Sequence, residues 1–170
     1  AGWDSDGGIW LDGGPLTLTN SLLSTAGGNG IRIDNSSPVL TGNSYTNNTR
    51  AAIAMNLNCD PDIHGVTASG NGTNGLVLDG GTLAAGGLNW DDPDIVYVLF
   101  SDVTVPAGST LSIAAGQVVK AGYGPVDLLV DGTLVAAGSA GALVEFTSYR
   151  DDDVGGNTNG TADGPYRGIW

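Results

Sequence analysis

The sequence has 170 residues, of which 41% are apolar and 29 are glycine, so it is long enough for one domain with a sizeable core. Eighteen acidic residues against five basic ones give a net charge of −13, which argues against nucleic acid and anionic membranes as partners. No apolar run is long enough to embed the chain in a membrane. The single cysteine, Cys59, excludes an internal disulfide or a cysteine-based zinc site.

The apolar residues follow strand spacing rather than helix spacing along the whole chain. No window sustains the i, i+3, i+4, i+7 pattern of an amphipathic helix, and glycine at a helix position costs about 1 kcal/mol relative to alanine. Short runs of valine, isoleucine and leucine recur instead, separated by glycine, asparagine and aspartate. The sequence therefore predicts an all-β fold.

The first half of the chain contains a repeat of small, apolar, variable, apolar and Asp or Asn. It occurs at Gly8–Asp12, Gly30–Asp34, Ala52–Asn56 and Gly75–Asp79, with starts separated by 22, 22 and 23 residues. Each copy is a short strand with alternate side chains inward, closed by a turn residue. The residues expected to lie over one another in one interior row are Ile9, Ile31, Ile53 and Leu76.

A second run of short strands follows Pro15, Pro38 and Pro61 at the same period. Two strands per 22–23 residues, with space for a third, describe one coil of a solenoid. Stacked coils bury their few apolar side chains against their own copies and pair the backbone with neighbouring coils. The alternative is a β-sandwich with coincidental spacing, but the Asn-Gly and Asp-Gly pairs occur at coil spacing rather than between paired strands.

The second half keeps the period with other residues, since Leu111 and Leu134 again lie 23 apart. We expect a single domain over residues 1–170. Its parts are a first coil set at 1–90, an irregular connection at 91–102 and a second coil set at 103–170, which carries an Asp-rich loop at 150–166.

Several stretches resemble a known family. Val103–Lys120, Val130–Gly138, Val144–Ser148 and the Asp-rich insertion that ends in Gly168-Ile169-Trp170 are similar to segments of large bacterial secreted and surface β-helix proteins. The pattern Gly-Ile followed by Ser-Pro-Val-Leu-Thr-Gly-Asn resembles the pectate-lyase-like repeats of the same proteins. The resemblance implies a right-handed parallel β-helix that is extracellular or on a cell surface. It implies no particular activity, because the fold carries adhesins, scaffolds and polysaccharide enzymes alike.

The two ends of the chain offer no capping element of the kind that covers the strand edges of a solenoid. The closing tripeptide Gly168-Ile169-Trp170 repeats the opening Gly8-Ile9-Trp10. We therefore expect Ile9, Trp10, Ile169 and Trp170 to form assembly ends. Either the chain is part of a longer tandem array, or separate copies stack head to tail.

The Asp-rich loop alternates oxygen-bearing side chains with glycine, as calcium-binding loops do. The candidate Ca²⁺ ligands are Asp151, Asp153, Asn157, Asn159 and Asp163. The loop lacks the terminal glutamate of an EF-hand, and the alternative is a solvated loop outside the coil.

The turn residues Asp12, Asp34, Asn56 and Asp79 form a second polar ladder, whose side chains either cap turns in water or are bridged by a cation.

The sequence contains only weak candidates for catalytic residues. His64 is the only histidine and lies within a strand-like run, and the five basic residues are too scattered to nominate a lyase base. Asp91-Asp92 and Asp60/Asp62 could supply a glycosidase pair, and exposed tryptophans such as Trp10 could stack on sugars. We assign no catalytic residue. The expected function is an extracellular structural or adhesive module that continues head to tail, with polysaccharide binding or cleavage as the alternative.

Overall fold

The computed structural model describes residues 7–163, and within this range the chain forms short strands joined by turns, with no helix. Five parallel sheets contain the strands. Sheet A has seven: β1 (Gly7–Asp12), β4 (Asn29–Asp34), β7 (Ala51–Met55), β10 (Thr73–Leu78), β13 (Tyr97–Leu99), β16 (Val118–Ala121) and β19 (Glu145–Ser148).

The other four sheets have three strands each. Sheet B holds β2 (Thr17–Thr19), β5 (Val39–Thr41) and β8 (Asp62–His64), and sheet C holds β3 (Leu22–Ser24), β6 (Ser44–Thr46) and β9 (Thr67–Ser69). Sheet D holds β11 (Gly81–Thr82), β14 (Val103–Val105) and β17 (Leu128–Val130), and sheet E holds β12 (Gly87–Trp90), β15 (Thr110–Ile113) and β18 (Thr133–Ala136).

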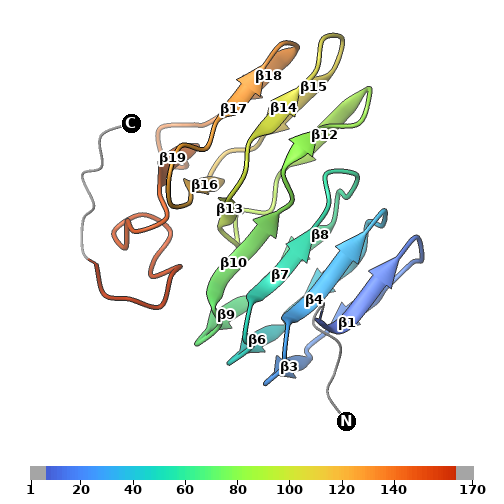
Figure 1. The fold of residues 1–170 in the computed structure, drawn as a ribbon, viewed down its shortest axis with the longest axis vertical. Helices are drawn as coiled ribbons and strands as arrows, with labels where there is room; N and C mark the ends of the chain where they lie inside the picture. Colours follow the sequence, from blue (N-terminus) through green and yellow to red (C-terminus); the bar gives the residue numbers. More distant parts are fainter. Residues whose placement is uncertain (1–6, 164–170) are drawn as a thin grey trace.

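The chain winds as a coil that enters sheet A once per turn, so each strand pairs with its counterparts in the neighbouring turns (Figure 1). The predicted interior row is confirmed: Ile9 pairs with Ile31, Ile31 with Ile53, and Ile53 with Leu76. It continues through Tyr97, Val119 and Phe146. The architecture is a parallel β-helix, as the sequence predicts, because every ladder between named strands is parallel.

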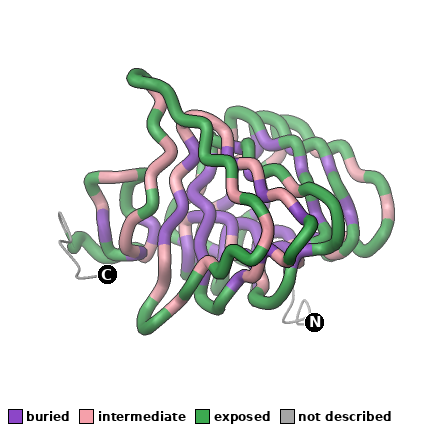
Figure 2. The backbone as a smooth tube through the Cα atoms, turned by 90° about the horizontal axis from the view of Figure 1, so that it is seen from above, coloured by how far each residue is buried: buried purple, intermediate pink, exposed green. Residues whose placement is uncertain are grey.

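The core fills the inside of the coil (Figure 2). The interior positions Ile31, Ile53 and Leu76 have no exposed surface, and Leu40 and Ile63 of sheet B face them from the other side of the coil. Full burial of such a side chain contributes about 1.5–3 kcal/mol. One coil cannot provide this burial alone, which is why the fold depends on stacking.

Buried asparagines replace backbone pairing at the corners of the first coils. Asn43, Asn48 and Asn71 each accept a hydrogen bond from a backbone N–H 22 or 23 residues earlier, at Ser21, Ala26 and Asn48 respectively. Each amide N–H₂ group also donates to a backbone carbonyl one coil back. Their side chains therefore supply the donor and acceptor that a strand would supply, which buried backbone groups require.

Left-handed residues mark the turns between sheets B and C. Asn20, Gly42 and Gly65 occupy equivalent turns with φ of 46°, 66° and 60°. Asparagine and glycine adopt this conformation at the lowest cost, which explains why they punctuate the repeat at coil spacing.

One predicted boundary is wrong. The stretch 91–102, expected to be an irregular connection, contains β13, which pairs with β10 and β16 and keeps sheet A continuous. The periodicity was hidden because the interior position holds Tyr97 instead of the aliphatic residue of the four preceding copies. Residues 149–163, which include the described part of the Asp-rich loop at 150–163, leave the coil and lie against the outer face of sheet A (Figure 1).

Candidate functional site

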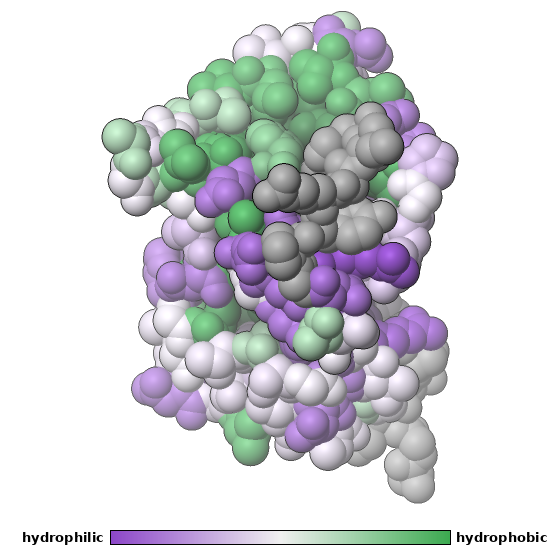
Figure 3. All heavy atoms as spheres, turned by 90° about the vertical axis from the view of Figure 1, so that its left-hand side faces the viewer, coloured by the Kyte–Doolittle hydropathy of each residue, from purple (hydrophilic) through white to green (hydrophobic). Residues whose placement is uncertain are grey.

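The C-terminal end of the stack, formed by β17, β18 and β19, exposes interior positions. Val105 and Val119 are buried, but their partners in the next coil, Val130 and Phe146, are 42% and 46% exposed. Among residues 7–163, no strand pairs with the outer edges of these three strands. Figure 3 shows apolar side chains gathered in the upper part of the molecule, where the C-terminal coils lie. This end offers both apolar side chains and unpaired backbone to a further coil.

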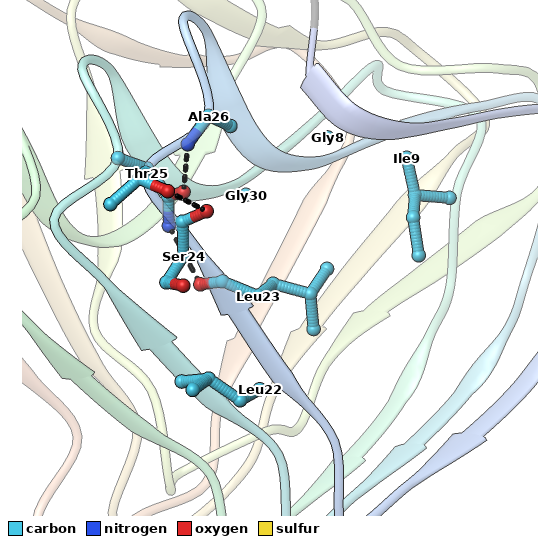
Figure 4. A pocket seen from close by; sticks show the side chains of 9 residues that line it. Gly8, Ile9, Leu22, Leu23, Ser24, Thr25, Ala26 and Gly30 are labelled. Atoms are coloured by element: carbon cyan, nitrogen blue, oxygen red, sulfur yellow. Dashed lines mark hydrogen bonds between the residues drawn. The ribbon is translucent and has the colours of Figure 1, made fainter.

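The N-terminal end carries a hollow of about 290 Å³ between sheet C and sheet A. Its lining includes Ile9, Leu22, Leu23 and Ala26, and Figure 4 shows Leu23 and Ile9 pointing into the same space. Alanine stands at position 26, one coil before Asn48. The equivalent position in the next coil holds Asn48, whose amide is larger, so the small side chain of Ala26 leaves space at the end of the stack.

The predicted assembly residues are placed only in part. Ile9 lies in the interior row, and Trp10 points outward with 61% of its surface exposed. Ile169 and Trp170 lie outside the described residues, so their expected role stays a prediction.

A guanidinium occupies the predicted turn ladder. Arg32 lies on the outer face of sheet A and donates to both Asp34 and Asp79, with its Nη2 atom 2.5 Å from a carboxylate oxygen of each. It reaches Asp79 across β7, where the aligned residue is Ala54. The Nε1–H group of Trp10 also donates to Asp34, at 2.8 Å. The cation that bridges this ladder is therefore a side chain of the protein.

These contacts set the charge state of the ladder. The hydrogen bond from Arg32 lowers the pKa of Asp34, burial opposes this shift, and the indole of Trp10 adds to it. The pKa of Arg32 is raised, mainly by its hydrogen bond with Asp79. Arg32 and Asp34 are therefore both charged near neutral pH, and Arg32 is committed to two partners.

The candidate calcium residues contact one another and the protein backbone. Asp151 accepts from the hydroxyl of Thr147 and from its neighbour Asp153 N–H, and Asn159 donates to Asp163 through Nδ2. Asn157 contributes its backbone carbonyl to Nδ2 of Asn74. Within residues 7–163, no group of three or more His, Cys, Asp or Glu side chains is arranged to hold a metal ion. The calcium site stays a prediction.

An acidic junction joins the two coil types, formed by Asp60, Asp91, Asp92 and Asp94. In a parallel ladder alternate N–H groups point to the next coil, and sheet B ends at β8. The carboxylates of Asp92 and Asp94 accept these N–H groups, from Ile63 at 2.7 Å and from Gly65 at 2.6 Å. Two aspartates therefore cap the edge of β8 in place of a strand.

Burial raises the pKa of Asp92 to about 6, with the charges of Asp91 and Asp60 adding to the effect against the hydrogen bonds from Tyr97 and Ile63. The pKa of Asp60 is also raised, first by burial and then by the charge of Asp91. Among the predicted glycosidase residues, Asp60, Asp91 and Asp92 are therefore close enough to interact. Asp62 instead pairs with His64 on an exposed surface, at 2.7 Å.

Sequence reasoning missed Lys120, which is buried under the Asp-rich loop. It also missed the pairing role of Arg32 and the capping roles of Asn48 and Asn71. The 23-residue spacing of the two asparagines was a usable signal, since it equals the repeat. No comparable signal pointed to Lys120, because its partners lie 31 to 38 residues later.

The coil stack, with its interior row and open end, defines the class of the protein as a β-solenoid. The chain belongs to the right-handed β-helix family, because the family model described as "Right handed beta helix region" matches residues 3–105. No curated protein and no solved structure matches the chain. Within residues 7–163, no helix is long and apolar enough to cross a membrane.

Proposed function

We propose that the chain is an extracellular structural or adhesive module, in which the described coils are followed head to tail by further β-coils. The observation that carries the proposal is the open interior at the C-terminal end, where Val130 and Phe146 belong to interior rows yet remain exposed. Exposed apolar surface is unfavourable by about 25 cal/mol per Å². Another coil is the complementary partner, because it supplies strand edges and apolar rows together.

Two features support a place outside the cell. The net charge of −13 keeps an elongated scaffold soluble. Cys59 is buried, and burial raises the pKa of its thiol, so the protein tolerates an oxidising environment without a disulfide. The resemblance to secreted bacterial β-helix proteins points the same way.

The hydrogen bonds and ion pairs of the charged residues support a scaffold role rather than a catalytic one. Arg32 is held by two carboxylates, and both oxygens of Asp92 accept hydrogen bonds from the protein. His64 has one charged partner, Asp62, and both are exposed to water.

The test is the mass of the chain in solution over a wide concentration range, measured by sedimentation. We expect end-to-end association, seen as mass that grows with concentration, and fibres in electron microscopy. Val130→Asp should abolish it, because it places a charge in an interior row at the interface. Val135→Asp is the matched control, since Val135 is 45% exposed but lies beside the outward-facing Ser112. A strictly monomeric chain, or equal effects of both variants, would refute the proposal.

One observation favours polysaccharide binding as a second candidate. The indole of Trp10 is exposed on the outer face of sheet A, and its hydrogen bond to Asp34 fixes the orientation of the ring. Oriented aromatic faces are suited to stack on sugar rings. Quenching of tryptophan fluorescence by neutral and acidic polysaccharides, lost in Trp10→Ala, would support this candidate. No binding by the wild type would eliminate it.

A further inference from the structure

The side chain of Lys120 carries an ammonium group that is buried, although it lies on the outer face of a sheet. It lies on β16 beside the interior residue Val119, so its side chain projects from the outer face of sheet A, in the row that also contains Val77 and Val98. That face would normally be solvated, yet Lys120 has no exposed surface because residues 149–163 cover it. A buried charge needs partners, and the covering segment supplies them.

Three oxygens of this segment surround the ammonium. The Nζ atom of Lys120 donates to the carbonyl of Asp151 at 2.6 Å, to the carbonyl of Gly156 at 2.8 Å and to the hydroxyl of Thr158 at 2.8 Å. All three protons of the ammonium therefore have an acceptor. Burial lowers the pKa of Lys120, and the charges of Asp151 and Asp152 oppose that shift.

The same segment is anchored two strands away from Lys120, on β10. The backbone N–H of Asn74 donates to the carbonyl of Thr158 at 2.7 Å, and the hydroxyls of Thr73 and Tyr149 lie 2.8 Å apart. These contacts exploit an irregularity of β10, whose register with β7 shifts between Thr73 and Leu76. Residues 149–163 thus span β10, β13 and β16, and we call them the strap.

The strap also packs closely on the sheet. Tyr149 shares a small apolar cluster with Val96 and Val98, and its ring contacts those of Phe100 and Tyr123 edge-on. Gly155 lies so near the sheet that a β-carbon there would come within 2.7 Å of a methyl group of Val96. The strap therefore continues the packed structure across the outer face.

We propose that the strap is a clamp latched by the ammonium of Lys120, which takes the place that a metal ion would take in the Asp-rich loop. In a solenoid each coil contacts only its neighbours, so coils near an end open independently. The strap adds contacts between coils that are not neighbours. It makes β10, β13 and β16 open as one unit, and it does so without calcium.

The chemistry of the loop agrees with an internal cation. Calcium requires six to eight oxygen ligands. The carboxylate oxygens of Asp151 already accept from Thr147 and from the backbone of Asp153, and Oδ1 of Asn159 accepts from the backbone of Thr161. One ammonium with three oxygens is satisfied by the groups that remain. This inference does not depend on the proposed scaffold role.

The experiment uses the fact that Lys120 is the only lysine of the sequence. The rate at which an amine-reactive acetylating reagent modifies Lys120 reports opening of the strap, and peptide mapping separates this site from the terminal amine. In the folded wild type we expect modification at least about 100-fold slower than in urea, because the amine reacts only from the open state. Millimolar CaCl₂ should leave the rate unchanged.

Two variants complete the test. Thr158→Val removes one acceptor of the ammonium and should speed modification about tenfold, as the loss of one hydrogen bond to a charge does. Thr161→Val, at an exposed position of the same strap, is the control and should change nothing. Hydrogen exchange in Thr158→Val should rise in β10, β13 and β16 together and stay constant in β1 to β7. Rapid modification of the folded wild type, a rate that calcium changes, or exchange confined to the strap would overturn the proposal.

Discussion

Asp92 ties the stability of the junction to pH. Its side chain is 2% exposed, with Oδ1 2.7 Å from the N–H of Ile63 and Oδ2 2.6 Å from the hydroxyl of Tyr97. Burial raises its pKa from the ordinary 3.8 to about 6. The folded protein therefore holds a proton on Asp92 that the unfolded chain releases more readily.

The sign of the effect follows from this difference. Stability from protonated Asp92 is fully present below pH 3.8 and is lost as the pH rises through 6. The difference between 3.8 and about 6 corresponds to about 3 kcal/mol, at about 1.36 kcal/mol for each pKa unit. Asp34 acts in a separate window. Its lowered pKa contributes stability above its ordinary value of 3.8, which is lost as the pH falls through its folded value.

Asp92→Asn isolates the contribution. The amide keeps one oxygen for the N–H of Ile63 and turns its NH₂ group to the oxygen of Tyr97, and it carries no charge. Relative to the wild type, the variant should gain about 2 kcal/mol of unfolding free energy between pH 4 and pH 7, which is most of the full effect. Urea titrations followed by fluorescence of the buried Trp90 would measure this gain, because Trp90 packs against Tyr97. Asp131→Asn, at an exposed turn, is the control. A stability difference from the wild type that is the same at both pH values would refute the reasoning.

Three further substitutions test other parts of the structure. Asn48→Leu should cost about 2–4 kcal/mol in urea unfolding, because it leaves the N–H of Ala26 and the carbonyl of Leu23 without their partner, whereas the exposed Asn58→Ala should cost little. Arg32→Met should cost about 1–3 kcal/mol, because Asp34 and Asp79 lose the charge between them, and 1 M NaCl should shrink that loss. Gly155→Ala should speed proteolysis of the strap. Gly156→Ala is its control, since both residues have a positive φ, 66° and 74°, but a β-carbon at Gly156 meets nothing within 4 Å. Equal cleavage of the two variants would contradict the packing argument.

The interior of the fold could be predicted because it repeats. Ile31 and Ile53 face the same side of successive coils. Their 22-residue spacing therefore predicts the fold, the direction of the strands and their register. Where the interior residue changes character, the prediction fails, as at Tyr97. An aromatic side chain there packs against Trp90 of β12 and donates to Asp92 of the acidic junction, and neither partner belongs to the interior row of sheet A.

The candidate site could be predicted only where its residues belong to the repeat. The Asp ladder was visible in the sequence, but the bridging Arg32 was not, because its second partner, Asp79, is 47 residues away and is reached only when Ala54 leaves room between them. The Asp-rich loop could be recognised in the sequence from its amino-acid composition. Its contacts with Lys120 and Asn74 depend on the path of the loop across sheet A, which spacing does not encode.

In such a fold, function depends on the positions at which the type of residue in a row changes from one coil to the next. An interior row must remain apolar along the stack, so it is free to vary only in size, and the outer rows carry the differences between one β-helix and another. In sheet A the outer row changes from Arg32, held in an open charge network, to Val98 and Lys120, sealed beneath the strap. The face is thereby divided into a part that solutes can reach and a part closed by the chain itself. Any ligand of the outer face of sheet A should therefore bind over β1, β4 and β7. Substitutions beneath the strap should change the stability of the protein without changing that binding.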